Sequence, residues 1–251
     1  MRELFTILPK KSGRGAKGHI SVRHQGGRSK RYLRGIDFKR NKHDVWGVVE
    51  SIDYDPNRNV QLAMVKYQDG ERRYILMPLG LKEGGRVISS ESAPVEVGNA
   101  LPLKKIPAGT QIHNIEIKPG KGGQMIRGAG SVAVVQGKEG EYVLIKLTSG
   151  EVRRFNPESW ATVGQVGNIE ERSRRLGKAG RKRNMGIRPS VRGVAMHPNA
   201  HPHGGGEGRS GVGMKYPKTV YGKPAVGKTR KHKKYSDKLI VKPRKKGPHV
   251  G

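Results

Sequence analysis

The sequence predicts a mainly β protein in which two small barrels lie between basic extensions that lack regular structure. Short stretches of β-branched and aromatic residues recur about every 8–12 residues with turn signals between them, a spacing typical of small barrels. Hydrophobic residues make up only 33% of the 251 positions, and glycine occupies 37. That composition is too poor in apolar residues for one core along the whole chain, so we expect part of it to order only on a partner.

The excess positive charge lies at the two ends of the chain. Residues 1–42 carry 13 basic and 2 acidic side chains, residues 43–170 carry 15 of each, and residues 171–251 carry 23 and 3. The middle therefore has the balance of an ordinary soluble domain, while the ends hold the whole net charge of +31. Because unneutralised charge of this size destabilises a compact state, we expect a polyanion as the partner, and nucleic acid fits best.

The first predicted barrel covers residues 43–107. Its first strand, Val45–Tyr54, ends at a turn signal of Asp, Pro and Asn. The next strand, Val60–Tyr67, alternates so that every second residue from Val60 lies on one face. Asp69-Gly70 then predicts a hairpin turn into the strand Arg72–Met77.

A patch rich in proline and glycine, Pro102–Gly109, predicts the boundary with a second barrel over residues 108–178. Stretches of strand-forming residues again alternate with turn residues. The predicted strands are Gln111–Ile117, Ser131–Gln136, Glu141–Leu147 and Glu151–Phe155, and a helical turn is predicted near Glu170–Lys178.

The remaining segments, 1–42 and 179–251, are the predicted basic extensions. They combine Lys, Arg and His with frequent Gly and Pro and show no sustained apolar period. Because glycine permits close approach to a sugar–phosphate backbone, this composition favours segments that become ordered on RNA. Tails that stay disordered in the working complex are the alternative.

One segment, Gly222–Thr229, matches the phosphate-binding pattern G-x-x-x-x-G-K-[ST]. A nucleotide loop requires a buried strand before it and a helix after it, whose N-terminus faces the phosphates. Pro217 interrupts the residues before the match, and the cationic run Arg230–Lys234 after it has no apolar face, so we reject a nucleotide hydrolase. Two G-x-G-x-x-G matches, which begin at Gly13 and Gly206, lack the βαβ context of a dinucleotide site.

Three histidines, His197, His201 and His203, lie in a glycine-rich segment that ends at Arg209. Histidines in such number are candidates for metal ligation or general base catalysis. Glu207 is the only acid nearby, and the chain has no cysteine. We therefore favour a loop that contacts RNA over a metal site or a catalytic centre.

The segment Lys118–Gly130 stands out in the balanced middle region. Three cations and five glycines lie there between two predicted strands. A hairpin tip exposed to solvent is the alternative, but the composition favours a loop that is pressed against a nucleic-acid backbone.

Several other classes of protein are disfavoured. The lack of cysteine excludes disulfides and cysteine-ligated zinc. No apolar run approaches the roughly 20 residues of a membrane-spanning helix, and we expect no membrane partner. Residues 1–11 contain too few apolar residues for a secretory signal, which favours a cytoplasmic protein.

A series of motifs makes the chain resemble a known family. They are Asp37–Lys42, Tyr54–Arg58, Asp69–Leu76, Lys118–Arg127, Leu176–Gly180, Arg188–Gly193 and His201–Arg209. In this order, from Gly13 to Lys246, they resemble the universal large-subunit ribosomal protein two family in its bacterial form. The chain departs from the family at Ala200, where an Asp usually precedes His-Pro-His, and its N-terminal portion looks shorter than usual.

The resemblance implies an oligonucleotide-binding-type (OB) barrel followed by an SH3-like barrel. It implies primary binding to the large-subunit rRNA, support of subunit association and of the peptidyl-transferase region, and peptide transfer that is catalysed by the rRNA. The implied partners are this rRNA, neighbouring ribosomal proteins and the small subunit, in the cytoplasm or in an organelle that encodes its own ribosomal proteins. No cofactor is expected, with structural magnesium shared with the rRNA left open.

From composition, motifs and resemblance together, we expect a set of basic and imidazole side chains to contact RNA, with no catalytic residue and no metal ligand among them. They are Arg14, Lys17, His19, Arg23, His24, Arg31, Lys39, Arg40, Lys118, Lys121, Arg127, Arg181, Arg183, Arg188, Arg192, His197, His201, His203, Arg209, Lys228, Arg230 and Lys231.

Overall fold

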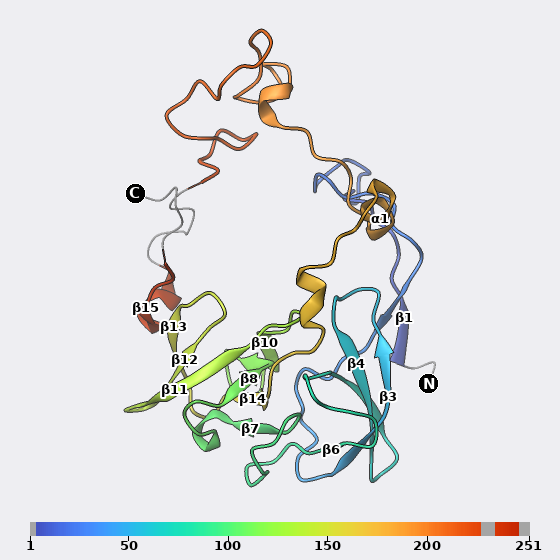
Figure 1. Ribbon diagram of the computed structural model, residues 1–251, viewed down its shortest axis with the longest axis vertical. Coiled ribbons are helices and arrows are strands. Elements are labelled where there is room, and N and C mark those ends of the chain that lie inside the picture. Colours follow the sequence, from blue (N-terminus) through green and yellow to red (C-terminus); the bar gives the residue numbers. More distant parts are fainter. Residues whose placement is uncertain (1–3, 227–233, 246–251) are drawn as a thin grey trace. The chain divides into compact units, whose positions relative to one another are not determined.

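The computed structural model describes residues 4–226 and 234–245, and the chain divides into two compact units. The barrel unit comprises Met1–Pro9, Lys30–Arg175 and Lys238–Arg244. The basic unit comprises Lys10–Ser29, Leu176–Asp237 and Lys245–Gly251. The chain therefore makes two excursions out of the barrel unit, over Lys10–Ser29 and Leu176–Asp237, and leaves it again after Arg244. The return of β15 to β13 can be followed in Figure 1.

The first barrel is a four-stranded antiparallel sheet with the strand order β5-β4-β3-β6. Its strands are β3 (Gly47–Tyr54), β4 (Gln61–Tyr67), β5 (Arg72–Leu76) and β6 (Arg86–Val87). The predicted hairpin turn at Asp69-Gly70 is confirmed, and Gly70 has φ 85°, a conformation that glycine adopts without strain. A bulge between Val49 and Ser51 shifts the register of β3 against β4.

Both faces of β4 are buried, although the sequence pattern predicted a strand with one apolar face. Leu62 and Met64 belong to one hydrophobic cluster with Tyr74 and Val166, as the alternation indicates. Ala63 and Val65 on the opposite face belong to a second cluster inside the sheet. Such a strand needs a cover on its outer side, since exposed apolar area of this size is unfavourable.

Part of the predicted N-terminal extension supplies this cover. Strands β1 (Phe5–Ile7) and β2 (Tyr32–Arg34) pair with each other, and Ile36 bridges to Tyr74 of β5. Phe5, Ile36 and Phe38 pack against the outer cluster. The structure thus differs from the predicted division at residue 42, because the apolar side chains among the cations of residues 30–42 are packed into the barrel unit.

The second barrel is built from a seven-stranded sheet with the strand order β15-β13-β12-β11-β8-β14-β7. Four of these strands were predicted at least in part: β8 (Gln111–His113), β11 (Ala133–Glu139), β12 (Tyr142–Lys146) and β13 (Val152–Phe155). Three were not: β7 (Ala100–Pro102), β14 (Trp160–Val163) and β15 (Ile240–Lys242). The predicted fold class, mainly β with an OB-type barrel followed by an SH3-like barrel, is confirmed.

The transition between the barrels precedes the predicted boundary at residue 107. β7 pairs with β14, so Ala100–Pro102 already belongs to the second sheet. Leu103 and Ile106, within the proline- and glycine-rich patch, are fully buried in the core of the second barrel. The patch is therefore an internal connection of this barrel, through the short 3-10 helix Leu103–Lys105.

β15 joins the sheet from the far end of the predicted C-terminal extension. It pairs antiparallel with β13, with Val152 opposite Lys242 and Arg153 opposite Ile240 (Figure 1). The segment 179–251 is thus not a simple tail, because it returns to the barrel unit after a long excursion.

The basic unit has little regular structure in its described residues. It contains the helix α1 (Ala179–Met185) and the 3-10 helix Gly193–Ala195, while the predicted helical turn near Glu170 is a 3-10 helix, Ile169–Arg172, of the barrel unit. Residues from the two predicted extensions are hydrogen-bonded to each other, since Gly26 N–H donates to the Gly186 carbonyl at 2.8 Å and Arg188 N–H to His24 O at 2.9 Å. The described parts of the chain include no helix that is long and apolar enough to span a membrane.

Candidate nucleic-acid interface

The loop Lys118–Gly130 is held from inside by one buried carboxylate, Glu116. This residue, 2% exposed, ends the short strand β9 (Ile115–Glu116). Its carboxylate accepts hydrogen bonds from the backbone N–H groups of Gly120 (3.2 Å), Gly122 (2.6 Å) and Trp160 (3.1 Å). Charge-assisted bonds of this kind are among the strongest in proteins, so the loop is fixed and is not a mobile tip.

The loop also contains a strand that the sequence pattern hid. β10 (Gly123–Met125) pairs with β9, and the N–H of Gly123 donates to the Phe38 carbonyl at 2.8 Å. A Cβ atom at Gly123 would lie 2.1 Å from Asn114 Oδ1, so only glycine fits here. The close approach locks the loop against residues 38–39 of the N-terminal segment.

Three of the predicted RNA contacts on this loop are exposed, and a fourth lies beside them. Lys118, Lys121 and Arg127 are all exposed. Lys39, from the N-terminal segment, is exposed as well and runs directly over Gly122, whose Cβ position is 2.9 Å from Lys39 Cγ. Four cations from segments about eighty residues apart thus share one region of the barrel unit, as close packing across the sequence allows.

Phe38 organises two arginines in the same region. The Arg127 guanidinium lies 4.5 Å from the centre of the Phe38 ring, and that of Arg58 lies 5.8 Å from it. Arg58 is oriented by the fully buried Asp55, with Nη1 at 2.7 Å from Oδ2. A surface pocket beside Phe38 is lined by both arginines, Asn57 and Gly128. Stacked guanidinium groups at a pocket suit phosphate and nucleobase contacts.

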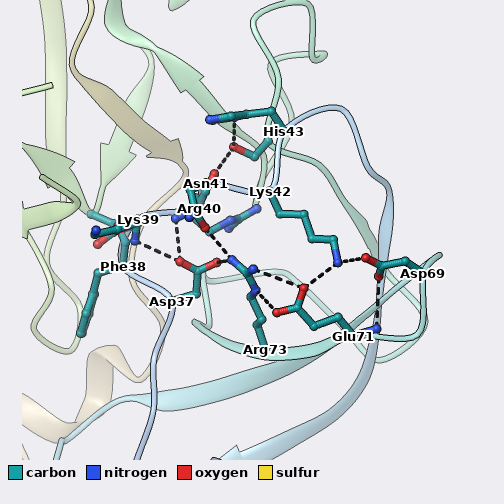
Figure 2. A network of polar contacts seen from close by, with 12 residues as sticks. Asp37, Phe38, Lys39, Arg40, Asn41, Lys42, His43, Asp69, Glu71 and Arg73 are labelled. Carbon is teal, nitrogen blue, oxygen red and sulfur yellow. Dashed lines mark hydrogen bonds and ion pairs between the residues drawn. The ribbon is translucent and has the colours of Figure 1, made fainter. Parts of the chain in front are cut away.

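The segment that carries Phe38 and Lys39 is pinned by a network of charges, which Figure 2 shows. Asp37 accepts the backbone N–H of Arg40 at 2.7 Å and a bond from Arg73 Nη1 at 3.0 Å. Arg73 also binds Glu71 at 2.7 Å, and Lys42 reaches both Glu71 and Asp69. Hydrogen bonds from Arg73 and then from Lys42 hold the pKa of Glu71 below its ordinary value. The charge of Lys42 is thus neutralised within the protein.

Arg40 and Arg31, two of the predicted RNA contacts, already donate hydrogen bonds to carbonyl groups of the protein. Arg40 is 3% exposed, and its Nη2 donates to the Gly98 carbonyl at 3.2 Å. A buried guanidinium offers no surface to a phosphate, so we leave Arg40 out of the proposed interface. Arg31 is half-buried and donates from Nη1 to the Pro56 carbonyl at 2.6 Å.

The basic unit holds most of the other predicted contacts. The exposed ones are Arg14, Lys17, His19, Arg23, His24, Arg181, Arg183, Arg188, Arg192, His197 and Arg209. By sequence, Lys10–Ser29 and Leu176–Asp237 contain 21 basic residues and only two acids, Glu207 and Asp237. None of the buried hydrophobic residues in the described chain belongs to this unit. Its order therefore cannot come from a core of its own, and a polyanion is the partner that its charge requires.

The histidine segment forms a compact turn in the basic unit. The rings of His201 and His203 lie 4.7 Å apart, and a Cβ atom at Gly193 would lie 2.4 Å from the His201 ring. The N–H of His203 donates to His201 Nδ1 at 3.0 Å, and the N–H of Lys218 donates to His203 Nε2 at 2.9 Å. Among the described residues, no group of His, Cys, Asp or Glu is arranged to hold a metal ion.

These two hydrogen bonds determine which nitrogen of each imidazole carries the proton and faces a ligand. A nitrogen that accepts a backbone N–H carries no proton, so the neutral ring is protonated at its other nitrogen. His201 therefore presents Nε2–H and His203 presents Nδ1–H, and both are hydrogen-bond donors. Donors suit phosphate, ribose and base oxygens, whereas a general base needs a free lone pair.

The nucleotide-loop match is explained by a hairpin. Thr219 N–H donates to Lys223 O at 2.7 Å, and Ala225 N–H to Pro217 O at 2.8 Å. Gly222 stands in the turn and Lys223–Val226 return along the stem, so this half of the motif has no phosphate-binding geometry. Lys228, Arg230 and Lys231 lie outside the described residues.

Two protein-family models match the chain. "Ribosomal Proteins L2, RNA binding N-terminal domain" matches residues 1–89, and "Ribosomal Proteins L2, C-terminal domain" matches residues 96–222. The chain belongs to the ribosomal protein L2 family. As an L2 protein it is an RNA-binding structural constituent of the large subunit of the ribosome. The L2 family is a family of structural proteins and not of classical enzymes.

The two L2 domains meet between residues 89 and 96, just before β7, where the structure also passes from the first sheet to the second. Sequence reasoning missed three residues of the candidate interface of this L2 protein: Phe38, Arg58 and Glu116. Arg58 follows the turn signal Asp55-Pro56-Asn57 and enters the sequence analysis only as the last residue of the family motif Tyr54–Arg58. A buried acid beside a glycine-rich loop was the available signal for Glu116.

Proposed function

We propose that this L2 protein is a primary binder of the large-subunit rRNA. The observation that carries the proposal is the basic unit, whose described residues lack buried hydrophobic side chains and whose charged residues are almost all cationic. Such a unit is ordered best when phosphates neutralise it and release counterions. The barrel unit adds the fixed cluster of Lys39, Arg58, Lys118, Lys121 and Arg127.

The two units divide the work of binding in this proposal. The barrel unit docks as a folded body, with the two arginines on Phe38 at the contact. The basic unit threads between RNA segments, and its glycines allow close approach to the backbone.

By this binding the protein supports subunit association and the peptidyl-transferase region, next to neighbouring ribosomal proteins and the small subunit. His201 and His203 contact RNA as donors, and peptide transfer is left to the rRNA. Ala200 supplies no carboxylate to orient a histidine, which agrees with this assignment. The cytoplasmic ribosome is the proposed location.

The decisive experiment measures the affinity of the full chain for large-subunit rRNA as a function of salt. Between 50 and 200 mM salt we expect affinity to fall by about 10³ or more, as for a protein with many phosphate contacts. Arg127→Ala should weaken binding by about tenfold, whereas Lys42→Ala, whose partners are protein carboxylates, should bind like the wild type. Salt-independent binding, or equal losses in the two variants, would contradict the proposal.

A further inference from the structure

Four hairpin turns of the protein share one backbone geometry. In each, a residue X donates its N–H to the carbonyl of X+4, and a glycine at X+3 donates to the carbonyl of X: the turns begin at Gly15, Tyr67, Leu147 and Thr219. The glycines, at positions 18, 70, 150 and 222, have φ between 75° and 85°. This is a type I turn closed by a glycine in the left-handed region.

The residue before the glycine, at the tip, differs between the two units. In the barrel unit it is Asp69 or Ser149, and each side chain accepts a backbone N–H two residues further on, from Glu71 at 3.2 Å and from Glu151 at 3.4 Å. Short polar side chains are favoured in turns for this reason. The barrel unit therefore fills the tip with residues that stabilise the turn itself.

In the basic unit the same position holds Lys17 or Tyr221. A tyrosine ring cannot accept the bond that Asp69 and Ser149 accept, so it adds nothing local to the turn. Tyr221 is 77% exposed, among the most exposed of the large hydrophobic side chains in the described chain. A tyrosine thus stands at a tip that a serine would suit better, and its exposed ring is free to contact a partner, as tyrosines commonly do at interfaces.

The hairpin that presents Tyr221 is firmly held. Proline on both sides of the stem, Pro217 and Pro224, restricts the backbone, and the Lys218 N–H is bonded to His203. The turn therefore offers the ring in a fixed position. A pre-organised contact loses little conformational entropy on binding.

The charge of the hairpin indicates the chemical class of the partner. Lys215, Lys218 and Lys223 lie within a few residues of Tyr221 in the sequence, and no acid occurs between Glu207 and Asp237. An aromatic ring among lysines matches a nucleotide, whose base stacks while its phosphates meet the cations. Lys17, at the same position of the other hairpin in this unit, has the matching chemistry for a phosphate alone.

We propose that Tyr221 is a stacking platform for an unpaired base of the rRNA, presented by a rigid hairpin whose lysines contact the flanking phosphates. The proposal rests on the proposed rRNA binding and adds to it a specific aromatic contact. It also assigns different roles to the two hairpins of the basic unit, stacking at Tyr221 and charge neutralisation at Lys17.

A substitution series in the full chain tests the ring. Tyr221→Ser keeps a turn-forming residue and removes the ring, so we expect rRNA binding about tenfold weaker, in the range found for loss of one stacked base. Tyr221→Phe and Tyr221→Trp should bind within about twofold of the wild type, because a ring is what stacking requires. Ser149→Tyr places a ring on the same type of turn in the barrel unit, and it should leave the affinity for rRNA unchanged.

Salt dependence separates stacking from charge. Tyr221→Ser should leave the slope of log affinity against log salt unchanged, whereas Lys218→Ala and Lys223→Ala should each reduce it by about one. The stacking proposal would be overturned if Tyr221→Ser bound rRNA as tightly as the wild type. It would also be overturned if Tyr221→Phe lost as much rRNA affinity as Tyr221→Ser.

A separate arm identifies the class of partner. In a Trp46→Phe, Trp160→Phe background, Tyr221→Trp reports at the tip, and a single-stranded RNA oligonucleotide should quench its fluorescence while a polyglutamate peptide of equal charge should not. Equal responses to both would overturn the base-stacking assignment in favour of an acidic protein. If the wild type itself failed to bind rRNA, the proposed function would fail; if it bound and the series were flat, only the platform would fail.

Discussion

The barrel unit and the basic unit of this L2 protein are ordered by different forces. The barrel unit buries three hydrophobic clusters, and its cations are largely matched by carboxylates, as in the network of Lys42, Arg73, Asp37 and Glu71. The basic unit, as far as it is described, holds its shape by backbone hydrogen bonds and a few side-chain hydrogen bonds such as those of His201 and His203. Ile20, Val191 and Tyr221 are exposed there. One chain thus joins a body that folds by burial to a body that needs a polyanion.

The comparison also shows how the role of a charged residue depends on its surroundings. Arg40 and Arg127 are both arginines of family motifs, but Arg40 is buried at the Gly98 carbonyl while Arg127 is exposed on Phe38. Counting cations therefore locates the interface only coarsely. Knowing which cations already have protein partners sharpens it.

The largest expected effect is on proteolysis. A lysine-specific protease should cut the free protein rapidly within residues 10–29 and 176–215, outside the hairpin that presents Tyr221, and should leave 30–175 intact, because cleavage follows local opening. Addition of large-subunit rRNA should protect the basic unit. Equal cleavage rates in both units, or no protection by the rRNA, would break the comparison.

A second test concerns the carboxylate inside the barrel unit. Glu116→Ala leaves three backbone N–H groups in a buried site without their acceptor, and we expect the free energy of unfolding to fall by about 3 kcal/mol. Urea unfolding followed by circular dichroism measures it. Glu141→Ala, at an exposed acid of the same barrel, should change stability by less than about 0.5 kcal/mol; similar values for the two would refute the role of Glu116.

A smaller effect is expected from pH. Burial lowers the pKa of His113 from 6.5 to about 4, although the bond from its ring to the Gly164 carbonyl, at 2.8 Å, opposes the shift. Between pH 4 and pH 6.5 the His113 imidazole is therefore protonated in the unfolded chain and neutral in the folded chain. Its contribution to the free energy of unfolding is fully present above pH 6.5 and is lost as the pH falls toward 4. Between pH 7.5 and pH 5 the barrel unit should lose about 2 kcal/mol.

The control for this pH effect is another histidine of the barrel unit. His113→Gln should flatten the stability profile over this range, whereas His43→Gln, at an exposed position, should leave its slope unchanged. Parallel profiles for His113→Gln and the wild type would show that another group is responsible.

The sequence predicted what depends on neighbours along the chain. β3, β4 and β5 were found because strand residues alternate around Asp69-Gly70, and the turn chemistry is local. β10 was hidden because it begins at Gly123, the glycine that close approach to Asn114 requires, in a glycine-rich loop. α1 was missed because Ala179–Met185 has no apolar face. β7 and β14 are short strands that define each other only by pairing.

The interface was predicted in outline for a related reason. Cations and glycines in the Lys118–Arg127 loop are visible in sequence, and their exposure agrees with the proposed role. That Lys39 joins them depends on its contact with Gly122 across the fold. That Arg40 does not depends on its burial at the Gly98 carbonyl. The apolar residues Ile36 and Phe38 were the signal that residues 30–42 belong to the barrel unit.

The pairing of β15 with β13 has a consequence for how the protein is made. β13 is finished long before β15 leaves the synthesising ribosome, and until then it is an uncovered sheet edge, open to wrong pairing. Once β15 pairs with β13, the roughly sixty residues of Leu176–Asp237 form a closed loop. The entropy cost of closing this loop is then no longer part of the cost of binding RNA. β15 therefore covers the exposed edge of β13 in the newly made sheet. By closing the loop it also reduces the conformational entropy that the segment between the two strands loses on binding RNA.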